Sequence, residues 1–256
     1  MIDSENQNKP TKKFGLLGRN ISYSFSSGYF SEKFAELGLE NHSYENFDIE
    51  NIEGFPQLLL NNLSKINGMN VTIPYKQEVL KYLDEIDEEA VEIGAVNTIK
   101  FLENGRKKGF NTDVFGFENS LKPLLELHHT KALILGTGGA SKAVAHALKK
   151  LNIQYVFVSR NPIGENQISY NTIDKELLQQ YTLLINCTPL GTFPNIKASP
   201  DLPYQYVTTN HLLYDLIYNP AITTFLQQGK EKGATIKNGL EMLQLQAEKS
   251  WQIWNS

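Results

Sequence analysis

The chain has 256 residues, enough for one large domain or two of ordinary size, with a core that needs no disulfide. Its 24 lysines and arginines stand against 28 acids, and the net charge of −4 excludes the basic surface that nucleic acids or anionic membranes require. One cysteine, Cys187, and five scattered histidines exclude an internal disulfide and zinc-site spacing, so no metal is expected. With no signal-peptide core and no run of membrane length, we expect a cytoplasmic protein with a small-molecule partner.

Strands and helices alternate along the first half of the chain. Apolar or alternating runs predict the strands, and apolar residues at helical spacing predict the helices. This alternation predicts an α/β layer. The predicted strands cover 13–17, 42–49, 68–73 and 94–101, the last leading into a hairpin at 103–106, and the predicted helices end near Leu39 or cover 55–63 and 78–93.

Two serines, Ser24 and Ser26, stand at the entrance to the first predicted helix. Their hydroxyls offer hydrogen bonds to a carboxylate without supplying charge. Serine is also a favoured helix cap, and from the sequence alone capping is the preferred interpretation.

A lysine and an aspartate are the candidate catalytic groups of the first half. In NVTIPYK, a strand places Asn70 and Thr72 on one face, Pro74 ends the ladder, and Lys76 lies just beyond it. A lysine after a strand is usually a solvated surface group, so Lys76 needs a partner. Asp113 precedes a predicted helix over 114–127, where it either caps the helix or positions and tunes a lysine nearby.

The stretch from Lys131 to Arg160 has the pattern of a nucleotide-binding unit. An apolar strand leads into a glycine turn at 136–139, an amphipathic helix follows, and a second strand covers 155–159. Glycines allow a pyrophosphate to approach the main chain, and the helix start offers N–H groups to it. The alternative is a merely structural turn, but the order strand, helix, strand favours a dinucleotide site.

The end of that second strand indicates which dinucleotide binds. NAD sites place an acid there to accept from the ribose 2′-hydroxyl, whereas here Arg160 follows Ser159 and the next acid is Glu165. A cation at this point attracts a 2′-phosphate, although a solvated arginine at a strand end is also common. The sequence therefore favours NADP over NAD.

The remaining segments complete an α/β pattern. No Pro/Gly/Ser-rich linker separates two domains, so the domain boundary is inferred from the clearest change in composition, at about Asp113. The loop 187–195 follows a strand, at the end of an α/β sheet where ligands bind, and Cys187 is expected to pack there. Gln246 lies on the last predicted helix, and judged by its residue type alone it would be expected to be exposed. Strands are predicted at 182–186 and 211–216, helices at 174–180, 221–232 and from about Gly239, and the last helix has a predicted core stripe of Leu240, Leu243, Ala247, Trp251 and Trp254.

Taken together, these motifs resemble the shikimate dehydrogenase family, from about Phe14 to Trp254. Three positions depart from the family pattern, since Ser27 replaces a frequent proline, and Ser159 and Asn161 flank Arg160 where the family has Asn and Thr. The matching motifs, in family order, are SxS at 24–26, NVTxPxK at 70–76, GAVNT at 94–98, NTD at 111–113, GxGGAS at 136–141, the NRT-type segment at 159–161, YDxxYxP at 214–220 and GxxMLxxQA at 239–247.

The resemblance implies an α/β protein of two domains with a cleft between them. Residues 10–112 with 238–256 would form an N-terminal substrate-binding catalytic domain, to which the last helix returns, and 113–237 a Rossmann-like NADP-binding domain. Lys76 and Asp113 would be the catalytic pair. The implied substrate residues are Ser24, Ser26, Thr72, Asn97, Asp113, Tyr218 and Gln246, and the implied cofactor residues are Gly136, Thr137, Gly138, Gly139, Ala140, Ser159, Arg160, Asn161, Leu216 and Gly239.

The activity that the resemblance implies is reversible, NADPH-dependent reduction of 3-dehydroshikimate to shikimate, a step of aromatic amino acid biosynthesis. Two alternatives stay open: a quinate/shikimate dehydrogenase of broader specificity, and a catalytically silent NADP-binding sensor. The serine hydroxyls favour shikimate, and the retained Lys76 and Asp113 favour an enzyme. The oligomeric state, monomer or homodimer, is left open.

Overall fold

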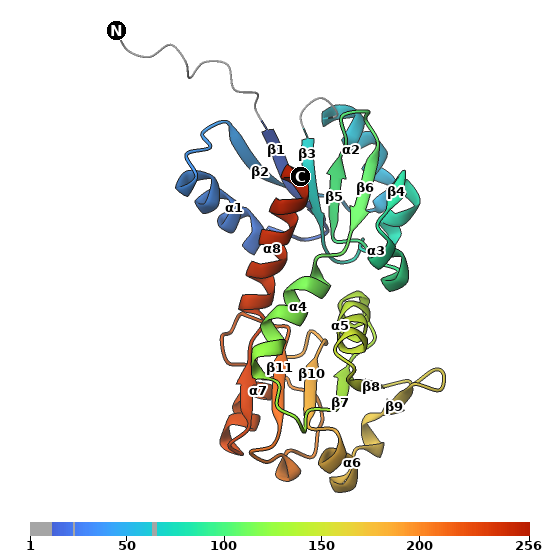
Figure 1. Ribbon diagram of the computed structural model, residues 1–256, viewed down its shortest axis with the longest axis vertical. Coiled ribbons are helices and arrows are strands. Elements are labelled where there is room, and N and C mark those ends of the chain that lie inside the picture. Colours follow the sequence, from blue (N-terminus) through green and yellow to red (C-terminus); the bar gives the residue numbers. More distant parts are fainter. Residues whose placement is uncertain (1–11, 23, 63–65) are drawn as a thin grey trace. The chain divides into compact units, whose positions relative to one another are not determined.

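The computed structural model describes residues 12–22, 24–62 and 66–256, whose helices and strands are shown in Figure 1. They form two compact units. Unit 1 contains the described residues up to Thr112 together with Ser250–Ser256, and unit 2 is Asp113–Lys249. The first two residues of the expected domain 10–112, and Leu63 at the end of a predicted helix, lie outside the described residues. Functional grouping of 238–249 with the first domain stays a prediction.

Unit 1 is built on a mixed sheet in the order β2-β1-β3-β5-β6-β4. β1 runs parallel to β2 and β3, while β5 is antiparallel to β3 and β6. The carboxyl ends of β1, β3 and β6 therefore lie at the same end of the sheet as the start of β5. The elements are β1 (Lys12–Gly18), β2 (His42–Asp48), β3 (Ile66–Val71), β4 (Glu85–Ile86), β5 (Thr98–Phe101), β6 (Lys107–Phe110), α1 (Phe25–Glu36), α2 (Phe55–Asn62), α3 (Glu88–Ile93), η2 (Ile52–Gly54) and η3 (Glu78–Tyr82).

An aromatic core joins the end of the chain to this sheet. The ring of Trp254 lies 4.9 Å from that of Phe14 and 5.3 Å from that of Phe30, between centroids. Its indole N–H donates to the Ile99 carbonyl at 3.0 Å. A Cβ on Gly68 would overlap the same indole, so β3 needs glycine there. Burial of these aromatic rings holds the last turns of the final helix in unit 1.

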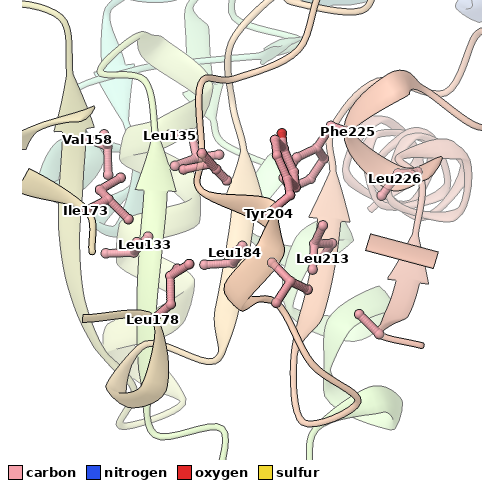
Figure 2. Close-up of a cluster of buried hydrophobic side chains, with 13 residues drawn as sticks. Leu133, Leu135, Val158, Ile173, Leu178, Leu184, Tyr204, Leu213, Phe225 and Leu226 are labelled. Atoms are coloured by element: carbon pink, nitrogen blue, oxygen red, sulfur yellow. The ribbon is translucent and has the colours of Figure 1, made fainter. Parts of the chain in front are cut away.

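Unit 2 contains a sheet whose neighbouring strands all pair in parallel, in the order β12-β11-β10-β7-β8-β9. Figure 2 shows Leu133, Leu184 and Leu213, from the neighbouring strands β7, β10 and β11, side by side in the core. Within the described residues, no helix has the length and apolarity to cross a membrane. The elements are β7 (Lys131–Leu135), β8 (Gln154–Ser159), β9 (Gln167–Ser169), β10 (Leu183–Asn186), β11 (Leu212–Asp215), β12 (Thr235–Lys237), α4 (Asp113–Leu121), α5 (Gly139–Lys150), α6 (Lys175–Gln180), α7 (Thr224–Glu231), α8 (Leu240–Asn255, whose last residues belong to unit 1), η4 (Lys122–Leu124), η5 (Tyr170–Thr172) and η6 (Tyr204–Tyr206).

The C-terminal helix α8 packs closely on α4 within unit 2. A Cβ on Gly116 of α4 would overlap the Met242 carbonyl, so glycine permits the approach. The predicted stripe is wrong at Leu240, which is 37% exposed. Ala247 and Trp254 are buried as predicted, whereas Leu243 and Trp251 are only half-buried. The buried face also includes Met242, Gln246 and Ser250, because it faces α4 in unit 2 and the sheet in unit 1.

Two predicted helices are wrong in part. The segment 78–93 is not one helix, because Glu85 and Ile86 pair with β6 and the Asp87 side chain accepts from Glu89 N at 3.2 Å to start α3. The helix predicted over 114–127 ends at Leu121, and Pro123 follows in a short 3₁₀ turn. The three-residue strands β9 and β12 at the two edges of the second sheet were not predicted.

Candidate active site

The predicted substrate residues of unit 1 gather at one end of its sheet. Backbone hydrogen bonds join the segments that carry them. Thr72 N donates to the Leu17 carbonyl at 2.9 Å, and Val96 N donates to the Lys76 carbonyl at 2.7 Å. The end of β1, the segment after β3 and the segment before β5 are therefore held together, and they bring Thr72, Lys76 and Asn97 to the same end of the sheet.

Ser24 does not act as the predicted cap. It occupies the N-cap position of α1, but its side chain makes no capping hydrogen bond. Its hydroxyl is buried and has no hydrogen-bond partner among the described residues. The capping interpretation is therefore wrong for this side chain, and the orphaned hydroxyl fits a polar group of a ligand, since a buried polar atom without a partner is costly.

Asn97 is held in place by the segment that leads to Asp113. Its Oδ1 accepts from Thr112 N at 2.7 Å and from the Thr112 hydroxyl at 3.1 Å. Asn111 ties the same segments, since its Nδ2 donates to the Ala95 carbonyl at 2.9 Å. Asp113 is the first residue of α4 and is only 6% exposed. The first two residues of the NTD motif thus tie the end of β6 to the start of β5.

Unit 2 carries two more predicted substrate residues, Tyr218 and Gln246, and two predicted cofactor residues outside the glycine turn and the end of β8, Leu216 and Gly239. Gln246, which its sequence context alone would leave exposed, is 7% exposed beside Gly116. Tyr218 is half-buried, and burial raises the pKa of its phenol. A Cβ on Gly239 would overlap the Leu216 carbonyl, so this pair is in backbone contact and position 239 excludes any larger residue.

A cavity of about 700 Å³ lies at the carboxyl ends of β7, β8 and β10 in unit 2. Five predicted cofactor residues, among them Arg160, line it. The others in the prediction, Gly139, Ala140, Asn161, Leu216 and Gly239, are not among its lining residues. It is lined by Gly136, Thr137, Gly138, Val158, Ser159, Arg160, Ser169, Tyr170, Asn171, Cys187, Thr188, Pro189, Leu190, Ser199 and Asp201.

The glycine turn leaves main chain open to this cavity. Gly136 has a φ of +104°, a left-handed conformation that favours glycine. An added Cβ on Gly138, the N-cap of α5, would meet nothing within 4 Å. The start of a 12-residue helix therefore faces open space with its N–H dipoles, which suits a phosphate group.

Arg160 is the only cation among the described residues that line the cavity, and Asp201 is the only carboxylate. The end of β8 carries no acid, and the Ser159 hydroxyl accepts from Asn161 N at 3.2 Å. Burial raises the pKa of Tyr170 to about 12, and the Arg160 charge opposes that rise. The lining fits a dinucleotide with an additional phosphate.

Sequence reasoning missed several lining residues. Thr188, Pro189 and Leu190 belong to the loop 187–195, which the sequence marked as a ligand site without assigning roles. The others come from β9, η5 and the connection between β10 and β11, where no motif or spacing singled them out. They are Ser169, Tyr170, Asn171, Ser199 and Asp201.

A buried carboxylate lies at the end of β11. Asp215 is fully buried and accepts from Asn186 Nδ2 at 3.0 Å, Thr223 Oγ1 at 2.6 Å and Ile217 N at 3.0 Å. Desolvation nevertheless raises its pKa from 3.8 to about 6, and these hydrogen bonds oppose the shift. Asn186 also accepts from the Thr188 hydroxyl at 2.6 Å, which joins this carboxylate to the cavity wall.

Asp215 should make the stability of the wild type depend on pH. Because its folded pKa is raised, its contribution is fully present below pH 3.8 and is lost as the pH rises through about 6. Relative to Asp215→Asn, the wild type should lose about 2–3 kcal/mol of unfolding free energy between pH about 4 and about 8. Urea unfolding of both proteins across this range measures the difference, and a difference independent of pH would contradict the shift.

Comparisons with known proteins agree with this arrangement. A family model described as the shikimate dehydrogenase substrate binding domain matches residues 16–99. Shikimate dehydrogenase (NADP(+)) of Methanococcus maripaludis is 37% identical over 99% of this chain and 93% of its own, and that of Caldanaerobacter subterraneus is 37% identical over 95% and 91%. The Thermus thermophilus enzyme, solved with NADP(H) and shikimate, superposes with a TM-score of 0.83 at 34% identity, covering 95% of this chain and 93% of that one. The chain belongs to the shikimate dehydrogenase family.

Proposed function

We propose that this protein is an NADP-dependent shikimate dehydrogenase, which reversibly reduces 3-dehydroshikimate to shikimate in aromatic amino acid biosynthesis. The observation that carries the proposal is the near full-length similarity to enzymes of that activity. In this assignment residues 10–112 with 238–256 form the substrate domain, 113–237 form the cofactor domain, and the enzyme acts in the cytoplasm.

The cavity of unit 2 takes the cofactor. Gly136, Thr137, Gly138, Gly139 and Ala140 bring the main chain and the start of α5 to the pyrophosphate.

Arg160, between Ser159 and Asn161, pairs with the 2′-phosphate, and Leu216 and Gly239 lie beside the nicotinamide. When bound, NADPH supplies the hydride that reduces the substrate carbonyl.

Side chains of unit 1 and three side chains of unit 2 hold the substrate. The orphaned Ser24 hydroxyl is assigned to the substrate carboxylate, together with Ser26 in the first turn of α1. Polar side chains suited to the ring hydroxyls complete the set. They are Thr72, Asn97, Asp113, Tyr218 and Gln246.

Lys76 and Asp113 carry the proton chemistry. As the carbonyl becomes an alkoxide, its oxygen needs a proton and a nearby positive charge, and the Lys76 ammonium supplies both. Asp113, held at 6% exposure at the start of α4, orients the lysine and accepts a hydrogen bond from a substrate hydroxyl. In the reverse direction the same pair takes the proton from the shikimate hydroxyl.

An absorbance assay of nicotinamide reduction tests the proposal. The purified protein is given shikimate or quinate with NADP⁺ or NAD⁺, and kcat/KM is expected to be highest for shikimate with NADP⁺. A higher value for quinate would replace the proposal with a broader dehydrogenase. Cofactor binding without reduction on either substrate would favour the silent NADP-binding sensor.

A further inference from the structure

A buried hydrogen-bond network begins at Ser26 in the first turn of α1. The Tyr44 hydroxyl on β2 is hydrogen-bonded to the Ser26 side chain and donates to Asn70 Oδ1 at 2.8 Å. Ser26 is 8% exposed, Tyr44 7% and Asn70 4%. Burial raises the pKa of Tyr44, so the phenol stays protonated and keeps its donor.

Asn70 carries the network across the sheet to the last helix. Its Nδ2 donates to the Ser250 hydroxyl at 2.9 Å and to the Thr98 hydroxyl at 3.2 Å. The hydroxyls of Ser250 and Thr98 lie 2.8 Å apart, and Ser250 is fully buried. The network therefore joins β2, β3, β5 and α8.

The network also reaches a second predicted substrate residue, Asn97. The Thr98 hydroxyl donates to Asn97 Oδ1 at 3.1 Å, and Asn70 Nδ2 also lies 3.3 Å from the Asn97 carbonyl. Asn97 is 2% exposed. Ser26 is the second residue of α1, not part of a loop, and Asn97 lies just before β5, not in a strand as predicted. Both are thus tied to the same buried polar groups.

A buried polar network of this kind is not needed to stabilise the fold. Well-packed apolar side chains of similar volume would often do as well, whereas removing a single member leaves buried partners unsatisfied. A fully bonded polar network does hold each side chain in one orientation. What this network can contribute to function is a fixed orientation of the Ser26 and Asn97 side chains.

We propose that Tyr44, Asn70 and Ser250 are positioning residues for substrate binding, acting through Ser26 and Asn97. This inference rests on the proposed function. Tyr44 is the clearest member, because its hydroxyl is the bridge from Ser26 to Asn70. The network gives the two serines different roles, since the buried Ser24 hydroxyl has no partner among the described residues, whereas the Ser26 side chain is hydrogen-bonded to Tyr44.

Tyr44→Phe removes only the bridging hydroxyl and tests the inference. We expect KM for shikimate to rise about three- to tenfold, with kcat and KM for NADP⁺ changed by less than about twofold, because one buried hydrogen bond of positioning is lost. Ser250→Ala should act in the same direction, since it unpairs Asn70 from α8, and it provides an independent test if Tyr44→Phe does not fold.

A double-mutant cycle separates positioning from general loosening. If Tyr44 acts through Ser26, then Tyr44→Phe should add little to the KM effect of Ser26→Ala, whereas independent structural damage would multiply the two effects. Tyr204→Phe is the matched control. Its phenol is 9% exposed and donates to the Pro200 carbonyl at 2.8 Å in unit 2, so it should lower thermal stability without raising KM for shikimate.

The outcomes distinguish this inference from the proposed function. A wild type that does not oxidise shikimate would overturn the proposed function. An active wild type, combined with an unchanged KM for shikimate in both Tyr44→Phe and Ser250→Ala or with multiplying effects in the cycle, would overturn the positioning role alone.

Discussion

Lys76→Ala should lower kcat for shikimate oxidation by about 10²- to 10⁴-fold, the usual contribution of a positioned acid-base group. In the proposed mechanism, the substitution removes the charge that stabilises the developing alkoxide and the group that exchanges its proton. KM for NADP⁺ should change little, because the cavity proposed for the cofactor lies in unit 2. Steady-state kinetics with saturating NADP⁺ measures the effect.

Lys81→Ala provides the matched control for this variant. Lys81 lies five positions further along, with an exposed side chain 3.4 Å from Glu53, and its removal should leave kcat unchanged. If Lys76→Ala kept kcat within about tenfold of the wild type, Lys76 would not be the acid-base residue.

Asp113→Asn gives an independent check on the pair. If Lys76 and Asp113 act as one unit, the double variant Lys76→Ala, Asp113→Asn should be no slower than the slower of the two single variants, because the same step is already lost. Multiplying effects would mean that the two residues serve separate steps.

Arg160→Ala should raise KM for NADP⁺ by about ten- to a hundredfold and leave KM for NAD⁺ almost unchanged. The contact proposed for Arg160 is a charge-assisted hydrogen bond to the 2′-phosphate, and a bond of this kind contributes about 1.5–3 kcal/mol. Because Arg160 is the only cation among the described lining residues, no other described side chain of the cavity can replace its charge. Initial rates at varied NADP⁺ and NAD⁺, with shikimate saturating, measure both constants.

Two further variants sharpen this test. Ser159→Asp should reverse the preference, because the new carboxylate repels the 2′-phosphate and accepts from the ribose hydroxyl of NAD. Lys149→Ala removes a cation from the far end of α5, outside the cavity lining, and should leave both constants unchanged. Equal weakening of NADP⁺ and NAD⁺ by Arg160→Ala would instead indicate stacking on the adenine or support of the loop.

Local sequence patterns predicted many of the helices and strands. The apolar strand before Gly136, the glycine turn and the helical spacing after it predicted β7, α5 and β8, because strands and helices of this kind depend on residues close in sequence. The same patterns failed at 78–93, where pairing of Glu85 and Ile86 with β6 prevailed over helical spacing. Short edge strands carry too few residues for a period to appear.

The candidate site also has a part that local motifs predict and a part that only tertiary packing decides. Its glycines, Arg160 and Lys76 belong to motifs whose residues are neighbours in the chain, so the sequence by itself determined which of them to expect. Only the tertiary structure decided which polar groups are buried and what they contact. Asn70 and Ser250 meet although they are 180 residues apart, and Ser24 loses the capping role that its position suggested. Such contacts depend on packing between distant segments, and no local spacing encodes them.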